Sequence, residues 1–219
     1  MKEQLQKDFD NTIKNLSLSQ KDIEIKKFSL DNFINKGFPN RKEEDWKFSD
    51  LNQIINKNIG ELSFYNDYTS TNKVDTSVFV DGLEHNKIVF INGRIEKIDF
   101  DYEKKGQIEI IDQSETINKF DNNNSLSDLN NAFTNKCFKI VIKTGYQLLK
   151  PLIIYHTTNS KILSKNINLR LDFELQEDSC LRLIDLFNDT SEKNFLNIFY
   201  NFNLKEDAIL KNYKVDKLE

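Results

Sequence analysis

Apolar and polar residues alternate along residues 167–175, and the same alternation returns in residues 196–204, about 29 residues later. A two-residue period is typical of β-strands that bury one face. Each stretch ends at an acidic corner, residues 177–179 and 206–208, and apolar residues then resume at Leu181 and Leu210. The apolar positions of the two stretches are Ile167, Leu169, Leu171, Phe173 and Leu175, then Leu196, Ile198, Tyr200, Phe202 and Leu204.

A strand-plus-corner unit that recurs at a fixed interval indicates a stacked solenoid, because one unit cannot cover its own apolar face. An earlier, more degenerate unit has its corner at residues 143–146, between predicted strands at 138–142 and 148–155. We therefore predict a right-handed parallel β-helix, a single-stranded solenoid, whose first coils occupy residues 136–219. No polar cap closes its last coil, so we expect this chain to be the N-terminal part of a longer protein.

Helical patterns dominate the N-terminal residues, and we predict a helical module over residues 1–60. An amphipathic stripe of Ile25, Phe28, Phe33 and Ile34 predicts a helix over 23–34, and Gly37 provides its stop. A second helix is predicted to begin at Asn40, with a glutamate three residues later as in a capping box.

Short β patterns follow in residues 61–135, which we predict to be a connecting region. Asn92-Gly93 separates strands at 88–91 and 94–98 and predicts a tight hairpin, because both residues tolerate positive φ. Another strand is predicted at 107–111, and a short helix at 125–134 with Ser125 or Ser127 as its cap. The whole chain is thus predicted to be α+β, and mainly β.

Composition argues against two kinds of partner. The 219 residues carry a formal net charge of -4, and only four of the 31 basic residues are arginine, so neither nucleic acid nor an anionic membrane is favoured. The polar N-terminus lacks the apolar core of a signal peptide, and no stretch approaches the roughly 20 apolar residues that span a bilayer. We predict a cytoplasmic protein.

Histidine and cysteine offer little metal chemistry. His85 and His156 lie about 70 residues apart with no neighbouring ligand, so structural or exposed roles are favoured over a metal site. Cys137 and Cys180 are expected to be free thiols, Cys180 as a small buried residue and Cys137 as partly exposed. Neither cysteine has a second thiolate at the spacing that an iron–sulfur cluster needs.

Two carboxylates, Asp172 and Glu174, share one face of a predicted strand. On a β-helix such a pair could form an acid/base site, but Arg170 offers an ordinary counter-charge and the matching positions one repeat later are Asn201 and Asn203. A solvated outer face is the favoured interpretation. Because no glycine-rich phosphate loop is present either, we predict no enzyme and assign no catalytic, cofactor-binding or metal residue.

Three segments in order resemble the SufD branch of the SufB/SufD family of iron–sulfur cluster assembly proteins. They are residues 37–51 (GFPNRKEEDWKFSDL), the hairpin 88–94 (IVFINGR), and the pair 129–133 (LNNAF) and 143–152 (KTGYQLLKPL). The first departs from the family pattern at Phe38, where Leu is usual, at Asn40, where Thr is usual, and at Phe48-Ser49, where Tyr-Thr is usual.

The resemblance implies a non-catalytic scaffold subunit of the SUF complex that pairs with SufB and with the ATPase SufC. The iron–sulfur cluster would be assembled in that complex and not bound by this segment. Family members are longer, and their functional residues lie in a C-terminal half with no counterpart here, so no functional residue is transferred.

Two alternative functions are compatible with the same patterns. One is an exported β-helix carbohydrate-active enzyme that uses paired carboxylates, which would require a signal peptide and acids aligned over successive coils. The other is a generic β-solenoid interaction module with no link to iron. Copurification with SufB and SufC would separate the second from the scaffold hypothesis.

Overall fold

The computed structural model describes residues 2–14, 16, 18–60, 63–65, 72–114, 124–159, 162–189 and 193–216. Its helices are α1 (Lys2–Lys14), α2 (Gln20–Lys36), the 3₁₀ turn η1 (Glu44–Trp46), α3 (Leu51–Asn58), the 3₁₀ turn η2 (Thr76–Val78) and α4 (Ser125–Phe133). Its strands are β1 (Ser63–Phe64), β2 (Asn86–Ile91), β3 (Arg94–Asp99), β4 (Ile108–Asp112), β5 (Lys136–Ile142), β6 (Leu152–Thr158), β7 (Lys165–Leu175), β8 (Cys180–Asp189), β9 (Phe195–Leu204) and β10 (Ile209–Asp216).

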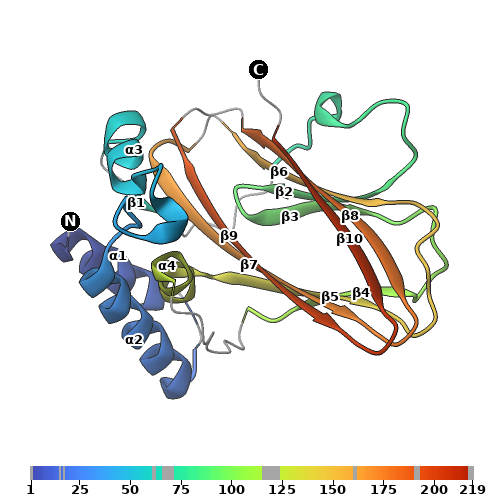
Figure 1. Cartoon of the computed structure of the whole chain (residues 1–219), viewed down its shortest axis with the longest axis horizontal. Coiled ribbons are helices and arrows are strands. Elements are labelled where there is room, and N and C mark those ends of the chain that lie inside the picture. The colour runs from blue at the N-terminus through green and yellow to red at the C-terminus, as the bar shows by residue number, and fades with distance from the viewer. Residues whose placement is uncertain are drawn as a thin grey trace.

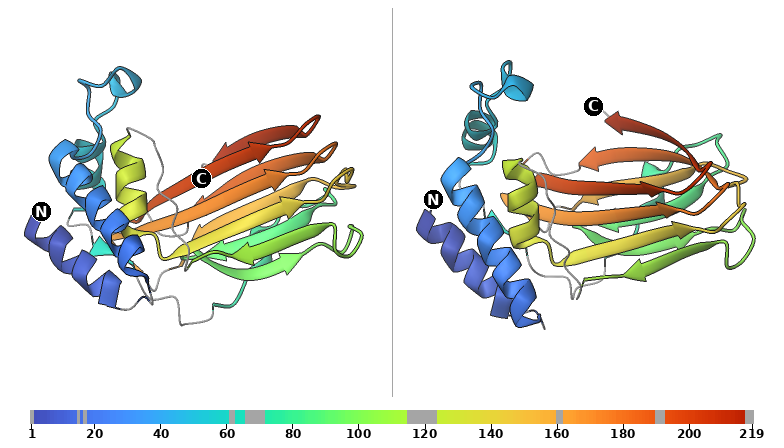
Figure 2. Two further views of the ribbon diagram at one scale, coloured as in Figure 1. Left: turned by 90° about the horizontal axis from the view of Figure 1, so that it is seen from below. Right: turned by 60° about the horizontal axis from the view of Figure 1, so that its bottom comes forward.

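The strands form two facing sheets, and the helices gather at one end of them (Figures 1 and 2). Sheet A has the order β4-β5-β7-β9, with β1 paired to the start of β7. Sheet B has the order β3-β2-β6-β8-β10. From β5 onward the chain places successive strands in alternate sheets, so both inner faces are built together.

The main apolar core fills the space between these sheets. Aliphatic and aromatic side chains from the inner faces of β2, β5, β6, β7 and β8 are almost fully buried there, as expected for strands whose every second residue is apolar. Aromatic rings continue this packing toward β9, where Phe173 of β7 stacks on Phe202 at 5.2 Å between centroids.

The predicted right-handed parallel β-helix is wrong. The structure is an α/β protein with four α-helices in its described part and two separate mixed sheets, in which β3 pairs antiparallel with β2 and β4 pairs antiparallel with β5. A two-residue period specifies which face of a strand is buried, but it does not specify how the strands connect or pair. An exported β-helix enzyme and a generic β-solenoid module both require a β-solenoid, so this fold does not support either alternative function.

The 29-residue spacing has a direct structural meaning within these sheets. Ile167 of β7 lies opposite Leu196 of β9, and Leu181 of β8 lies opposite Leu210 of β10, all in parallel register. The two acidic corners also match, because Asp178 and Asp207 adopt nearly the same positive φ, 55° and 53°. The amide of Asp178 donates to the carbonyl of Glu206 at 3.0 Å, which joins one corner to the next.

Helices α1, α2, α3 and α4 enclose a second core at the end of the sheets. The predicted helix at 23–34 lies within α2, whose last turn ends at Gly37 with φ 74° and a hydrogen bond from its amide to the carbonyl of Phe33. The predicted helix start at Asn40 is wrong. Helix α3 begins only at Leu51, and Asp50 caps it by accepting from the amide of Gln53 at 2.9 Å.

The hairpin, the strand and the short helix predicted within residues 61–135 are confirmed with small shifts. Asn92 and Gly93 turn the β2–β3 hairpin with φ values of 53° and 78°. Strand β4 covers most of the predicted strand at 107–111, and α4 matches the predicted helix at 125–134. The cap of α4 is Asn124, whose side chain accepts from the amide of Leu126, and not Ser125 or Ser127.

Lys26 joins α2 to the end of α4 from a fully buried position. Its Nζ donates to the carbonyl of Thr134 at 2.6 Å and to that of Asn131 at 3.1 Å. These carbonyls lack partners within the helix, so a lysine there satisfies groups that a helix terminus leaves open. Burial lowers the pKa of Lys26 from 10.5 to about 7.

Because the folded-state pKa of Lys26 lies below its unfolded value, the unfolded chain binds more protons above pH 7 and folding stability rises with pH. We expect the free energy of unfolding to increase by about 2 kcal/mol between pH 7 and 9. Above pH 9 the raised pKa of Cys137 opposes this trend. In urea titrations, the free energy of unfolding of Lys26→Met should no longer increase between pH 7 and 9, whereas that of Lys27→Met, at an exposed position, should still increase. An equal pH dependence of the two variants would contradict this role of Lys26.

Candidate functional site

A polar cluster lies inside the otherwise apolar space between the sheets. His156 of β6 and Asp185 of β8 are 2% and 3% exposed, and Tyr200 of β9 reaches them from the opposite sheet. The Tyr200 hydroxyl donates to the carboxylate of Asp185 and lies 2.7 Å from Nε2 of His156. Since that hydroxyl has already given its hydrogen to Asp185, it accepts from Nε2–H of His156, which assigns the tautomer of the imidazole.

Aromatic neighbours hold the imidazole in place. Phe90 of β2 and Phe187 of β8 are the residues directly beside His156 in the sheet, and their rings stack with it at 5.4 and 4.8 Å. Burial lowers the pKa of His156, with a further contribution from the positive charge of Lys214, while the neighbouring carboxylate of Asp185 opposes the shift. The histidine is therefore neutral at physiological pH.

This arrangement does not activate a nucleophile. Nε2 of His156 faces the Tyr200 oxygen and, at 3.5 Å, the carboxylate of Asp185, so among the described residues the histidine contacts no free hydroxyl or thiol whose proton it could accept for attack. Burial and the adjacent carboxylate raise the pKa of Tyr200 well above 10, which keeps the phenol protonated. The cavity beside His156 measures about 10 Å³, the size of a single water molecule. The cluster is a hydrogen-bonded connection between the two sheets.

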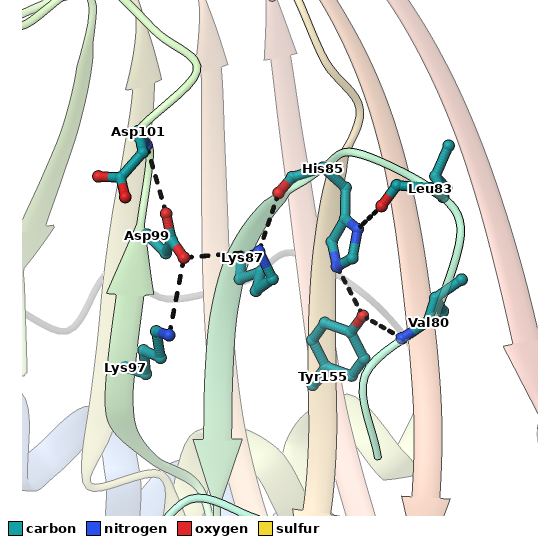
Figure 3. A network of polar contacts seen from close by, with 8 residues as sticks. All are labelled: Val80, Leu83, His85, Lys87, Lys97, Asp99, Asp101 and Tyr155. Carbon is teal, nitrogen blue, oxygen red and sulfur yellow. Dashed lines mark hydrogen bonds and ion pairs between the residues drawn. The ribbon is translucent and has the colours of Figure 1, made fainter. Parts of the chain in front are cut away.

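A second polar network lies on the outer face of sheet B (Figure 3). Tyr155 of β6 lies 2.8 Å from Nε2 of His85, and its oxygen accepts from the amide of Val80 at 3.1 Å. Nearby, Lys87 and Lys97 both face the carboxylate of Asp99, at 3.5 and 3.6 Å. His85 is 2% exposed, so the network is built into the structure and not displayed to solvent.

A third carboxylate, Glu103, organises the turn before β6. It accepts from the Tyr146 hydroxyl and from Nδ2 of Asn86, each at 2.6 Å, and from the amides of Leu149 and Lys150, each at 3.1 Å. Burial alone would raise the pKa of Glu103, but these four donors lower it on balance. Its oxygens are occupied by the protein itself.

The structure gives each histidine and cysteine considered from the sequence a structural setting. Both histidines are buried and hydrogen-bonded as described, and His156 lies inside β6. The expected exposures of the cysteines are wrong in both cases, since Cys137 is buried and Cys180 only partly buried. Both are free thiols, and burial raises the pKa of Cys137 to about 11, so this thiol is protonated and unreactive.

The carboxylate pair of β7 is likewise engaged. Asp172 accepts from Nε of Arg170 at 2.8 Å, and Glu174 pairs with Lys139 of β5 at 2.7 Å. Asn201 and Asn203 lie directly beside these two acids on β9. Each acid therefore has a cationic partner, but the Arg170–Asp172 pair is largely buried, so the expected solvated face is not found at this pair.

Sequence reasoning missed the residues that build the polar clusters. Tyr200 falls within a predicted apolar row, and no motif marks Asp185 or Tyr155. A signal does exist for Asp185, because it interrupts the apolar positions Leu181, Leu183 and Phe187 on the inner side of its strand. A charged residue at an inward position predicts a buried partner.

Comparisons with known proteins identify no relative: no family model matches the chain, and no curated protein is similar enough to count as a match. Within the described ranges, no group of three or more His, Cys, Asp or Glu side chains could hold a metal ion. No helix among these residues is long and apolar enough to cross a membrane.

Replacing Tyr200 with Phe tests the connection between the sheets. The change keeps the ring but leaves Asp185 and His156 without their shared partner, so the free energy of unfolding should fall by about 1–3 kcal/mol. Tyr213→Phe, at a position that is 57% exposed on β10, is the matched control and should change it little. Urea unfolding measures both, and equal losses in the two variants would refute the connection.

Proposed function

We propose that this chain is a non-catalytic scaffold subunit of an iron–sulfur cluster assembly complex, which pairs with SufB-type and SufC-type partners. The three segments that resemble the SufD branch support this proposal. The cluster itself is the product of the complex, and this chain contributes a surface that holds another subunit in place.

The observation that carries the proposal is a pair of open strand edges. Strands β9 and β10 are the last strands of sheets A and B, lie at the same side of the molecule (Figure 2), and have no further strand partner among the described residues. Over their ten and eight residues, each strand presents a row of backbone donors and acceptors on the side away from the strand it pairs with.

The side chains of β9 favour pairing over solvent exposure. None of its ten residues is charged. Edge strands that must stay unpaired usually carry lysine, proline or another charge that blocks addition of a strand. Its inward residues Ile198, Tyr200 and Phe202 are only partly buried, so a partner strand would complete their burial. Addition of a strand to such an edge is an established mode of protein recognition.

The hydrogen bonds and ion pairs of the titratable side chains support a scaffold role and not a catalytic one. His156, His85, Asp172 and Glu174 each bind groups of this chain. A body whose two sheets are tied together by Tyr200 is suited to present the β9 edge in a fixed position for addition of a partner strand.

Lysines at Asn201 and Asn203 test the β9 edge. Asn201 lies beside Asp172 and Asn203 beside Glu174, so N201K/N203K gains counter-charges within the chain and should fold normally. The same lysines would oppose addition of a partner strand, and we expect capture of co-expressed SufB by the tagged chain to fall roughly tenfold or more.

N201Q/N203Q is the control that keeps the positions neutral, and it should capture SufB as well as the unchanged chain does. Quantitative copurification with SufB and SufC provides the measurement. Absence of SufB from the unchanged, folded chain would refute the scaffold proposal, and equal capture by the lysine variant would refute the role of the β9 edge.

A further inference from the structure

The outer face of sheet B is covered by a strap, which we define as residues 72–85. Its apolar residues Val74, Val78, Phe79 and Val80 pack on a cluster formed by Val89, Ile91, Ile153, Tyr155 and Leu186. A cavity of about 260 Å³ remains where Val74 and Val78 meet strand β2. The strap has only the short 3₁₀ turn η2 for secondary structure, so its position depends on side-chain contacts with the sheet.

One chain of hydrogen bonds connects the strap to sheet B (Figure 3). Nδ1 of His85 lies 2.6 Å from the carbonyl of Leu83, and because a carbonyl only accepts, Nδ1 carries the hydrogen. Nε2 of neutral His85 is then an acceptor and receives the hydroxyl hydrogen of Tyr155 at 2.8 Å. The Tyr155 oxygen in turn accepts from the amide of Val80 in the strap.

The charges around His85 come from the two nearest strands and from the strap. Lys87 of β2 places its Nζ 3.2 Å from the carbonyl of His85, and it shares the carboxylate of Asp99 with Lys97. In the strap, Glu84 is engaged by Lys150 at 2.6 Å. Burial lowers the pKa of His85, and the positive charge of Lys87 adds to this, whereas the Leu83 carbonyl and Asp99 oppose it.

We propose that His85 is a proton-operated latch: binding of a second proton to its imidazole reverses the hydrogen bond with Tyr155 and releases the strap from sheet B. This device is independent of the β9 edge and goes beyond the scaffold role. It would expose the apolar outer face of sheet B when the surroundings become acidic.

The reversal follows from counting hydrogens. Protonated His85 carries hydrogen on both nitrogens, so Nε2 must donate to the Tyr155 oxygen instead of accepting from it. The hydroxyl hydrogen of Tyr155, a residue that is almost fully buried, then loses its acceptor, and the new cation lies close to Lys87. When the strap lifts, water can solvate both the imidazolium and the phenol, so protonation and release favour each other.

Hydrogen exchange of the strap amides, above all that of Val80, measures the opening. With an ordinary histidine in the released state, the ratio of open to closed strap should rise, by about 30-fold at most, between pH 7.5 and 5, after correction for the intrinsic exchange rates. The chain has only two histidines, which provides a matched pair of variants. His85→Gln should lose the rise, and His156→Gln should keep it.

Tyr155→Phe offers a second variant that keeps the ring packing. Without the hydroxyl, the strap amides should exchange fast at both pH values while those of β2 and β6 stay protected. An undiminished rise in His85→Gln would overturn the latch. Loss of protection at the amides of β6, such as that of Ile154, in parallel with the strap would overturn it as well, because that result indicates global unfolding.

Discussion

The in-register parallel pairing of β7 with β9 and of β8 with β10 is the constraint on which the rest of this structure depends. Residues 29 positions apart lie side by side, so the apolar row of β7 continues into β9 without a change of face, whereas β10 places Asn212 beside Leu183. The inward rows of both sheets then bury one another, which accounts for the main core. A shift of one residue in either pair would turn a whole row toward solvent.

Several buried polar groups are tolerated in this fold because a partner from another element matches them. Lys26 of α2 donates to the carbonyls that end α4, and Tyr200 of sheet A hydrogen-bonds with His156 and Asp185 of sheet B. Tyr155 accepts a hydrogen bond from the strap. A buried polar group that lacks a hydrogen-bond partner costs free energy, whereas a fully paired one fixes the relative position of the elements that it joins. The same residue types that could have formed a reactive site therefore connect parts of the fold, in agreement with the proposed scaffold role.

Local patterns allowed much of the secondary structure to be predicted. The Asn92-Gly93 hairpin, the end of α2 at Gly37 and the short helix α4 each depend on a few adjacent residues. The predicted start of the second helix was wrong because Asp50 is a better-placed cap for the apolar residues of α3 than Asn40 is.

The prediction of the overall architecture was wrong for a different reason. Alternation reveals a buried face but leaves strand order open, and the antiparallel strands β3 and β4 carry no repeat. The candidate clusters were still less predictable, because His156 and Tyr200 are 44 residues apart and His85 and Tyr155 are 70 residues apart.

Nuclear Overhauser contacts between neighbouring strands test the pairing most directly. We expect close backbone contacts between Leu171 and Tyr200, between Phe173 and Phe202, and between Ile184 and Tyr213, all with parallel geometry. Contacts displaced by one or more residues, or an antiparallel pattern between β7 and β9, would contradict the pairing.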